Sequence, residues 1–134
     1  MKGCELTVAP VAAGIFVEAD GHMLAAAVAN LLQNAFKFTR PHSHVVLRAY
    51  ASNGHVLIEV QDECGGLPPG VGEQIFQPFR QSGADRTGVG LGLTISRKAI
   101  EASGGSLSVR NLPGVGCVFT IDLPRAHAGR PLPP

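Results

Sequence analysis

The chain has 134 residues, 45% of them hydrophobic, which suffices for one compact domain with one core. Its formal net charge of +1 argues against a broad nucleic-acid surface or a polybasic membrane patch, so any bound anion is expected at a local site. No apolar run approaches the roughly 18 residues of a membrane span, and the N-terminus lacks the layout of a signal peptide.

The cysteines indicate a reducing compartment. Cys4, Cys64 and Cys117 are odd in number and widely spaced, and no Cys-x-x-Cys pair occurs. This pattern argues against a disulfide framework and against a zinc site. We therefore expect the domain in the cytoplasm, and a membrane anchor of the parent protein, where it has one, outside this chain.

The first predicted elements are a short strand at residues 14–18 and a long helix at residues 21–38. Asp20 is a suitable N-cap for this helix, which contains no proline and no internal glycine. An apolar stripe predicts its buried face: Leu24, Ala27, Val28, Leu31, Leu32 and Ala35.

Asn30, Asn34 and Lys37 share a narrow line at the margin of that stripe, because they lie at positions i, i+4 and i+7. Asn is a poor helix former, so two of them one turn apart need a reason. Two interpretations stay open at this point. The asparagines are polar residues at the core edge, bonded to each other or to a loop, or they offer an amide oxygen to a metal beside a lysine for a phosphate.

Two β-rich runs follow at residues 45–50 and 56–60, joined by an Asn-Gly turn at Asn53 and Gly54. The second run ends in Asp62 and a glycine-containing segment, residues 61–70. A carboxylate there can accept a hydrogen bond from an exocyclic amine, and glycines allow a flat base to approach the backbone. A surface Asp that merely opens a loop is the commoner case.

Residues 87–93 read Thr-Gly-Val-Gly-Leu-Gly-Leu and predict a loop that leads into a helix ending near Gly104, a left-handed C-cap. Leu91, Ile95, Ala99 and Ala102 form its expected apolar face. Backbone amides of glycines at the start of a helix favour phosphate binding. An ordinary glycine-rich turn that caps the helix would also explain this segment. A dinucleotide fold does not fit, because no strand precedes these glycines.

The last two predicted strands are residues 107–110 and 118–123, joined through Pro113 and Gly114. From Pro124 on, the composition is typical of a flexible tail or linker. We expect one domain at residues 1–124 and a tail at residues 125–134.

Taken together, these segments resemble the catalytic ATP-binding domain of sensor histidine kinases, within the superfamily that includes gyrase B, Hsp90 and MutL. Residues 30–39 resemble the N box, 62–67 the first glycine box, 76–79 the F box, 88–93 the second glycine box and 114–119 the third. The resemblance implies an α/β two-layer sandwich of the Bergerat type, with a mixed, mostly antiparallel sheet and helices packed on one face.

The resemblance also implies roles for individual residues. Asn34 would hold the Mg²⁺ that bridges the ATP phosphates, with Asn30 in support, and Lys37 would bind phosphate charge; Asn34 and Lys37 are thus the catalytic pair. Asp62 would accept the adenine amino proton, and Phe38 would lie against the adenine. The remaining implied nucleotide contacts are Gly66, Gly88, Val89, Gly90, Leu91, Gly92, Cys117 and the lid cations Arg80 and Arg86, within a lid at residues 80–87.

Three positions depart from the family pattern. Cys64 stands where the first glycine box usually begins its glycines, and Cys117 where the family often has Ser or Thr. In the true ATPases a glutamate one turn before the metal-binding Asn activates water, and Asn30 occupies that place here. An amide cannot take that proton, so the resemblance implies ATP binding with slow hydrolysis.

The implied phosphate acceptor is a histidine on a separate dimerisation domain, with a response regulator reached only indirectly. None of the chain's five histidines stands in an acceptor-like context: His22, His42, His44, His55 and His127. We expect a monomer without nucleic-acid or direct membrane contact. The alternatives are an interaction module that binds nucleotide without phosphotransfer, and a serine kinase of the anti-sigma type.

Overall fold

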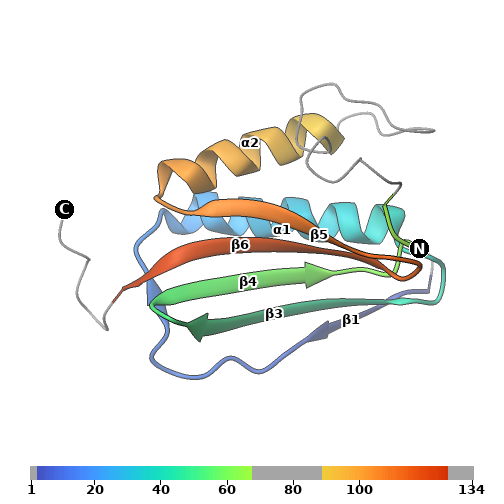
Figure 1. Cartoon of the computed structure of the whole chain (residues 1–134), viewed down its shortest axis with the longest axis horizontal. Helices are drawn as coiled ribbons and strands as arrows, with labels where there is room; N and C mark the ends of the chain where they lie inside the picture. Colours follow the sequence, from blue (N-terminus) through green and yellow to red (C-terminus); the bar gives the residue numbers. More distant parts are fainter. Residues whose placement is uncertain (1–2, 68–88, 127–134) are drawn as a thin grey trace.

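The computed structural model describes residues 3–67 and 89–126 of the chain. In this part, two helices, α1 (Gly21–Phe38) and α2 (Val89–Ala102), cover one face of a six-stranded sheet (Figure 1). The other face of the sheet is bare of helices in the described residues (Figure 1). The expected two-layer α/β architecture is confirmed.

The sheet is mixed but mostly antiparallel. Its order is β1-β3-β4-β6-β2, and β5 also pairs with β6. Of the described pairs, β1 with β3 is parallel and the others are antiparallel. The strands are β1 (Glu5–Val8), β2 (Phe16–Val17), β3 (His44–Ser52), β4 (His55–Gln61), β5 (Ser106–Leu112) and β6 (Gly116–Ala126).

Helix α1 has the bounds that its sequence predicts. The Asp20 carboxylate accepts hydrogen bonds from the backbone N–H groups of His22 (2.8 Å) and Met23 (3.1 Å), which satisfies two donors at the helix start. Leu31 and Ala35 are fully buried on the face toward the sheet. The helix ends where the Thr39 N–H donates to the Ala35 carbonyl at 2.8 Å.

Helix α2 packs with a different face from the one predicted. The expected stripe included Ile95, but Ile95 is 58% exposed, whereas Leu93, Ser96 and Ile100 are buried. Ser96 belongs to the buried face because it is hydrogen-bonded to α1, so a polar residue marks the inner side of this helix. The end of the helix is as predicted: Gly104 has a φ of +83°.

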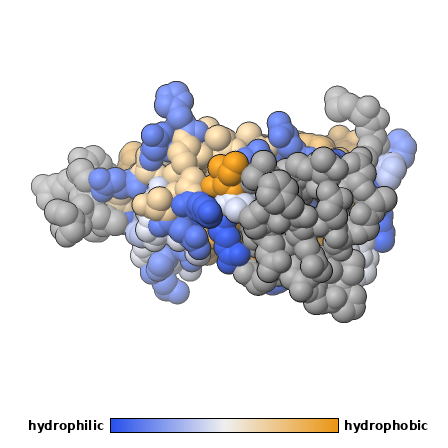
Figure 2. Space-filling model, turned by 90° about the horizontal axis from the view of Figure 1, so that it is seen from above, coloured by the Kyte–Doolittle hydropathy of each residue, from blue (hydrophilic) through white to orange (hydrophobic). Residues whose placement is uncertain are grey.

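The core lies between the helices and the inner face of the sheet. Its most deeply buried members are Leu31, Leu93, Ile100, Leu107, Ile121, Leu123, Val45 and Val60. Seen from above, the helix side of the molecule carries an apolar patch next to hydrophilic side chains (Figure 2). Ile95 is the large hydrophobic residue that the described helices expose.

Two strand features go beyond the sequence expectation. Strand β1 is an additional edge strand, and all four of its residues are exposed. Strand β6 continues past the expected end at residue 123, because Arg125 and Ala126 pair with β2. The described helices offer no segment long and apolar enough to cross a membrane.

Candidate nucleotide-binding site

Four elements approach one another at one end of the helix layer: the second half of α1, the end of β4, the start of α2 and the start of β6. The contacts that join them connect Asn30 to Ser96, Thr39 to Glu63 and Asp62 to Cys117. Residues predicted separately for metal, phosphate and base binding therefore come from segments that the fold holds together.

Asn30 connects the two helices. Its side-chain Nδ2 donates to Ser96 Oγ at 2.9 Å, and Ser96 is only 3% exposed. A Cβ added at Gly92 would lie 3.9 Å from the Asn30 Cγ and Oδ1 atoms, so the amide also covers the start of α2. Asn30 therefore acts as a support between α1 and α2, and its partner is a helix rather than Asn34 or a loop.

Asn34, Lys37 and Phe38 follow Asn30 along α1. Asn34 is partly exposed, and the structure records no hydrogen bond from its side chain to any described residue. Lys37 is exposed in the last turn of the helix, with Nζ 5.5 Å from the centroid of the Phe38 ring. Phe38 packs partly against the core. An amide, an ammonium and an aromatic ring thus end the same helix.

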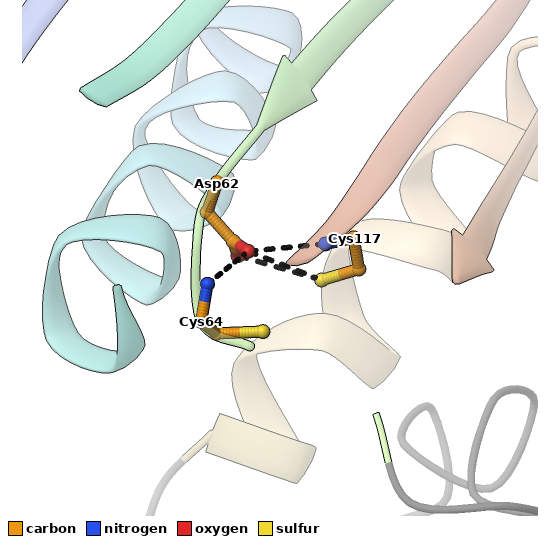
Figure 3. A group of neighbouring side chains, drawn as sticks. All are labelled: Asp62, Cys64 and Cys117. Carbon is orange, nitrogen blue, oxygen red and sulfur yellow. Dashed lines mark hydrogen bonds between the residues drawn. The ribbon is translucent and has the colours of Figure 1, made fainter. Parts of the chain in front are cut away.

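The Asp62 carboxylate is buried, with 3% of the residue exposed. Its Oδ1 accepts hydrogen bonds from the backbone N–H groups of Cys64 and Cys117, both at 3.1 Å (Figure 3). The Cys117 Sγ lies 3.4 Å from Oδ2 and 3.6 Å from Oδ1. Two backbone donors therefore fix the orientation of the carboxylate, and both bonds go to one of its oxygens.

Glycines make this arrangement possible. Gly65 and Gly66 have φ values of +100° and +98°, which favour glycine. A Cβ at Gly116 would collide with the Asp62 carbonyl oxygen and lie 2.9 Å from the Asp62 Oδ1. Gly66, expected to contact nucleotide, also lies where a Cβ would approach the Gly114 nitrogen at 3.1 Å. Gly116, the first residue of β6 and a member of the third glycine box, thus lies directly against Asp62.

The two thiols beside Asp62 influence each other. Hydrogen bonding with Cys117 lowers the pKa of the Cys64 thiol, against the opposing effects of burial and the Asp62 carboxylate. The pKa of the Cys117 thiol is raised, first by its hydrogen bond with Cys64, then by burial and by Asp62. All three cysteines of the chain are free.

Several supporting residues were not predicted. Thr39 is 1% exposed, and its Oγ1 accepts from the Glu63 N–H at 3.1 Å, so the end of α1 holds the segment after Asp62. The Asn111 side chain accepts from the Leu67 N–H at 2.8 Å and holds the other end of that segment. Ser96 completes the set. Each of these is a single polar residue outside any repeating pattern, so the sequence alone did not indicate its supporting role.

Part of the predicted site lies outside the described residues: Arg80, Arg86, Gly88, the F box at 76–79 and the lid at 80–87. The backbone of Val89, Gly90, Leu91 and Gly92 is described, and it forms the first four residues of α2. The predicted helix is confirmed, and it begins at Val89, two residues before Leu91, the first residue of its expected apolar face. The start of α2 still lies against Asn30, through Gly92.

Comparison with known proteins agrees with this geometry. The model of the family described as histidine kinase-, DNA gyrase B-, and HSP90-like ATPase matches residues 19–127. The solved structure of full-length ShkA in complex with AMPPNP superposes with a TM-score of 0.82 at 34% identity, over 98% of this chain and 27% of that one. The mycobacterial sensor histidine kinase MprB gives a TM-score of 0.76 at 32% identity, over 92% of this chain and 82% of that one.

Sensor proteins are among the similar sequences. TorS of Escherichia coli (strain K12) is 40% identical over 114 residues, which cover 85% of this chain and 12% of TorS. KdpD of Mycobacterium tuberculosis (strain ATCC 25618 / H37Rv) is 41% identical over 107 residues, which cover 78% of this chain and 12% of KdpD. The chain thus spans about an eighth of each relative, and it belongs to the family of histidine kinase-, DNA gyrase B-, and HSP90-like ATPases.

Proposed function

We propose that this chain binds Mg²⁺-ATP and transfers the γ-phosphate to a histidine on a separate dimerisation domain. The observation that carries the proposal is the Asp62 carboxylate, which is buried and oriented by two backbone amides from different strand ends. A buried acceptor held in this way suits recognition of an exocyclic amine, such as that of adenine. The chain's similarity to sensor proteins and a sensor histidine kinase supports the choice of a histidine as the phosphate acceptor.

In this proposal the Asp62 Oδ2 accepts the adenine amino proton, and Phe38 lies against the ring. Gly66 and Cys117 border the same pocket. The backbone of α2 from Val89 to Gly92, with Gly88 before it, offers amides to the phosphates, where the helix dipole favours negative charge. Arg80 and Arg86 remain proposed lid contacts to the γ-phosphate.

Asn34 and Lys37 handle the phosphate charge. The amide oxygen of Asn34 is a ligand type that suits a hard cation such as Mg²⁺, and its side chain is partly exposed. Lys37 follows one turn later and supplies a positive charge. Mg²⁺, when bound, would neutralise charge on the bridging phosphate oxygens.

The reaction itself is an in-line displacement. The acceptor histidine nitrogen forms a bond to the γ-phosphorus, the bond to the β–γ bridging oxygen breaks, and ADP leaves with that electron pair. The chain contributes positioning and electrostatic stabilisation. Asn30 cannot act as a base, and its amide is bonded to Ser96, which supports slow hydrolysis by water.

Partners and location follow from this role. The direct partner is the dimerisation domain of the parent kinase, the response regulator is reached indirectly, and the isolated chain is a monomer. Because its three cysteines are free thiols, we place the chain in the cytoplasm.

The test is phosphotransfer to a purified dimerisation domain that another histidine kinase catalytic domain is able to phosphorylate. We expect acid-labile phosphohistidine from the 134-residue chain, and a loss of more than about 100-fold in rate for Asn34→Ala, as expected when phosphate charge is no longer stabilised. Acid-stable product would instead identify a serine kinase. No product at high enzyme concentration, with the control kinase active, would favour the interaction module.

A further inference from the structure

Asp62, Cys64 and Cys117 form a cluster of three potential metal ligands at the ends of β4 and β6. One carboxylate oxygen and the two Sγ atoms all lie within 4.8 Å of one another. In Figure 3 the three side chains converge from neighbouring segments of the chain. The thiols are 53 positions apart in the sequence, so no Cys-x-x-Cys pattern announces them.

The spacing of these atoms fits a tetrahedral ion. With Zn–S and Zn–O bonds of about 2.3 and 2.0 Å, ligand atoms at a tetrahedral centre lie roughly 3.5 Å apart. The distance from Cys117 Sγ to Asp62 Oδ2 is 3.4 Å. The other two distances, from the Cys64 Sγ to the carboxylate oxygen and to the Cys117 Sγ, are within 4.8 Å, and a rotation of the Cys64 side chain would shorten them to this spacing.

The carboxylate is already oriented for this role. Both backbone N–H groups donate to Oδ1, and the Cys117 thiol lies 3.4 Å from Oδ2. Metal ligands are commonly held by such outer hydrogen bonds, which fix their orientation. Cys64 is partly exposed while Asp62 and Cys117 are buried, so an ion would enter from the side of Cys64.

We propose that Asp62, Cys64 and Cys117 bind a thiophilic divalent cation of the Zn²⁺ class through Oδ2 and the two Sγ atoms, with water as fourth ligand. Binding turns both thiols into thiolates and releases two protons to the solvent. Thiolate ligands select such ions over Mg²⁺, which prefers oxygen. The ligand set therefore distinguishes this site chemically from the Mg²⁺ position proposed at Asn34.

The cation also competes with nucleotide. This step rests on the proposed function, because it needs Oδ2 to be the acceptor of the adenine amine. A metal ion coordinated to Oδ2, Cys64 and Cys117 would occupy the position that the adenine amino group takes in the proposed function. A metal ion bound at the three ligands therefore excludes adenine, and thiophilic cations inhibit the domain through its base pocket.

The first test uses Co²⁺ as a spectroscopic probe of the full chain under non-thiol reductant. We expect one Co²⁺ per chain, with a thiolate-to-cobalt charge-transfer band and the visible bands of a tetrahedral ion, abolished by one equivalent of Zn²⁺. Cys64→Ser and Cys117→Ser should each weaken binding more than about 10-fold. Cys4→Ser, which removes the thiol outside the cluster, is the matched control and should keep the full spectrum.

The second test measures the binding of a non-hydrolysable ATP analogue with and without Zn²⁺. Zn²⁺ should weaken binding of the analogue to the wild-type chain more than about 10-fold and should have a much smaller effect on Cys64→Ser. The variant also serves as a control, because Zn²⁺ that binds the nucleotide itself would weaken binding to both proteins equally. Absence of the cobalt spectrum, or its loss in Cys4→Ser, overturns the metal site. A normal cobalt spectrum without any nucleotide binding keeps the metal site and overturns the proposed function instead.

Discussion

The Asn30 side chain donates a hydrogen bond to Ser96 Oγ across 2.9 Å and thereby joins α1 to α2. Ser96 is buried and lies on the inner face of α2, so this bond replaces water at the helix interface. The two asparagines of α1, one turn apart, consequently differ. Asn30 has a structural partner, whereas Asn34 has a proposed role toward Mg²⁺.

Asn30→Ala should therefore affect mainly the stability of the fold, and Asn34→Ala mainly the Mg²⁺-dependent binding of nucleotide. Loss of the Asn30 bond leaves a buried hydroxyl without its partner, and we expect a decrease of about 1 kcal/mol in the free energy of unfolding. Asn34→Ala should leave stability unchanged or raise it slightly, because Ala is the better helix former, while the Mg²⁺ dependence of nucleotide binding is lost. Urea denaturation measures the first effect and calorimetric titration the second; equal destabilisation by both variants would contradict this division.

Gly116→Ala should disrupt the site through its backbone. The added Cβ would lie 2.7 Å from the Asp62 carbonyl carbon and 2.9 Å from Oδ1, and backbone cannot yield as a flexible side chain can. We expect a loss of about 2 kcal/mol or more in the free energy of unfolding. Thermal and urea denaturation give the measurement.

Gly21→Ala provides the matched control, because nothing lies within 4 Å of its added Cβ and the residue begins α1. It should be neutral or slightly stabilising. An equal free energy of unfolding for Gly116→Ala and Gly21→Ala would show that β6 does not lie as close to Asp62 as described.

Tyr50 gives a pH-dependent prediction. Its hydroxyl donates to Glu59 Oε2 at 2.9 Å, and this bond, with burial and the Glu59 charge, raises the pKa of Tyr50 above the ordinary 10.0. The neutral phenol is favoured in the folded chain. Its stabilising contribution is therefore complete below pH 10.0 and is lost as pH rises through the raised pKa.

The chain has one tyrosine and no tryptophan, so ultraviolet absorbance reports on Tyr50 alone. We expect a titration midpoint above that of the urea-unfolded chain. Because Tyr50 is 38% exposed, Tyr50→Phe should lower the free energy of unfolding by less than about 1 kcal/mol at neutral pH, with the difference shrinking at alkaline pH. A midpoint equal to or below that of the unfolded chain would contradict the Tyr50–Glu59 bond.

Much of the helix and strand pattern could be predicted from local sequence. Helix α1 begins and ends as expected, because Asp20 caps it and its apolar stripe is unbroken. The hairpin of β3 and β4 follows from Asn53 and Gly54, both at positive φ. These signals act over a few residues and need no knowledge of the rest of the fold.

The features that were missed depend on distant partners. The buried face of α2 includes Ser96, which only its bond to Asn30 makes suitable for the interior. Strand β1 spans only four residues and all of them are exposed, so no buried face marks it in the sequence, and it exists through its parallel pairing with β3. In the site, the resemblance suggested a common pocket for Asp62 and Cys117, but the convergence of Cys64 on them needed the structure.

The most direct test of the proposed function is calorimetric titration of the chain with a non-hydrolysable ATP analogue, with and without Mg²⁺, and with NAD as a control ligand. Asp62→Asn is the informative variant, because its amide keeps one oxygen for the N–H groups of Cys64 and Cys117 while an NH2 donor replaces the other oxygen. We predict Mg²⁺-dependent binding to the wild type, about 10- to 100-fold weaker binding to Asp62→Asn, and no binding of NAD. Equal affinity of the wild type and a folded Asp62→Asn variant would show that Asp62 does not recognise the base, and would contradict the account.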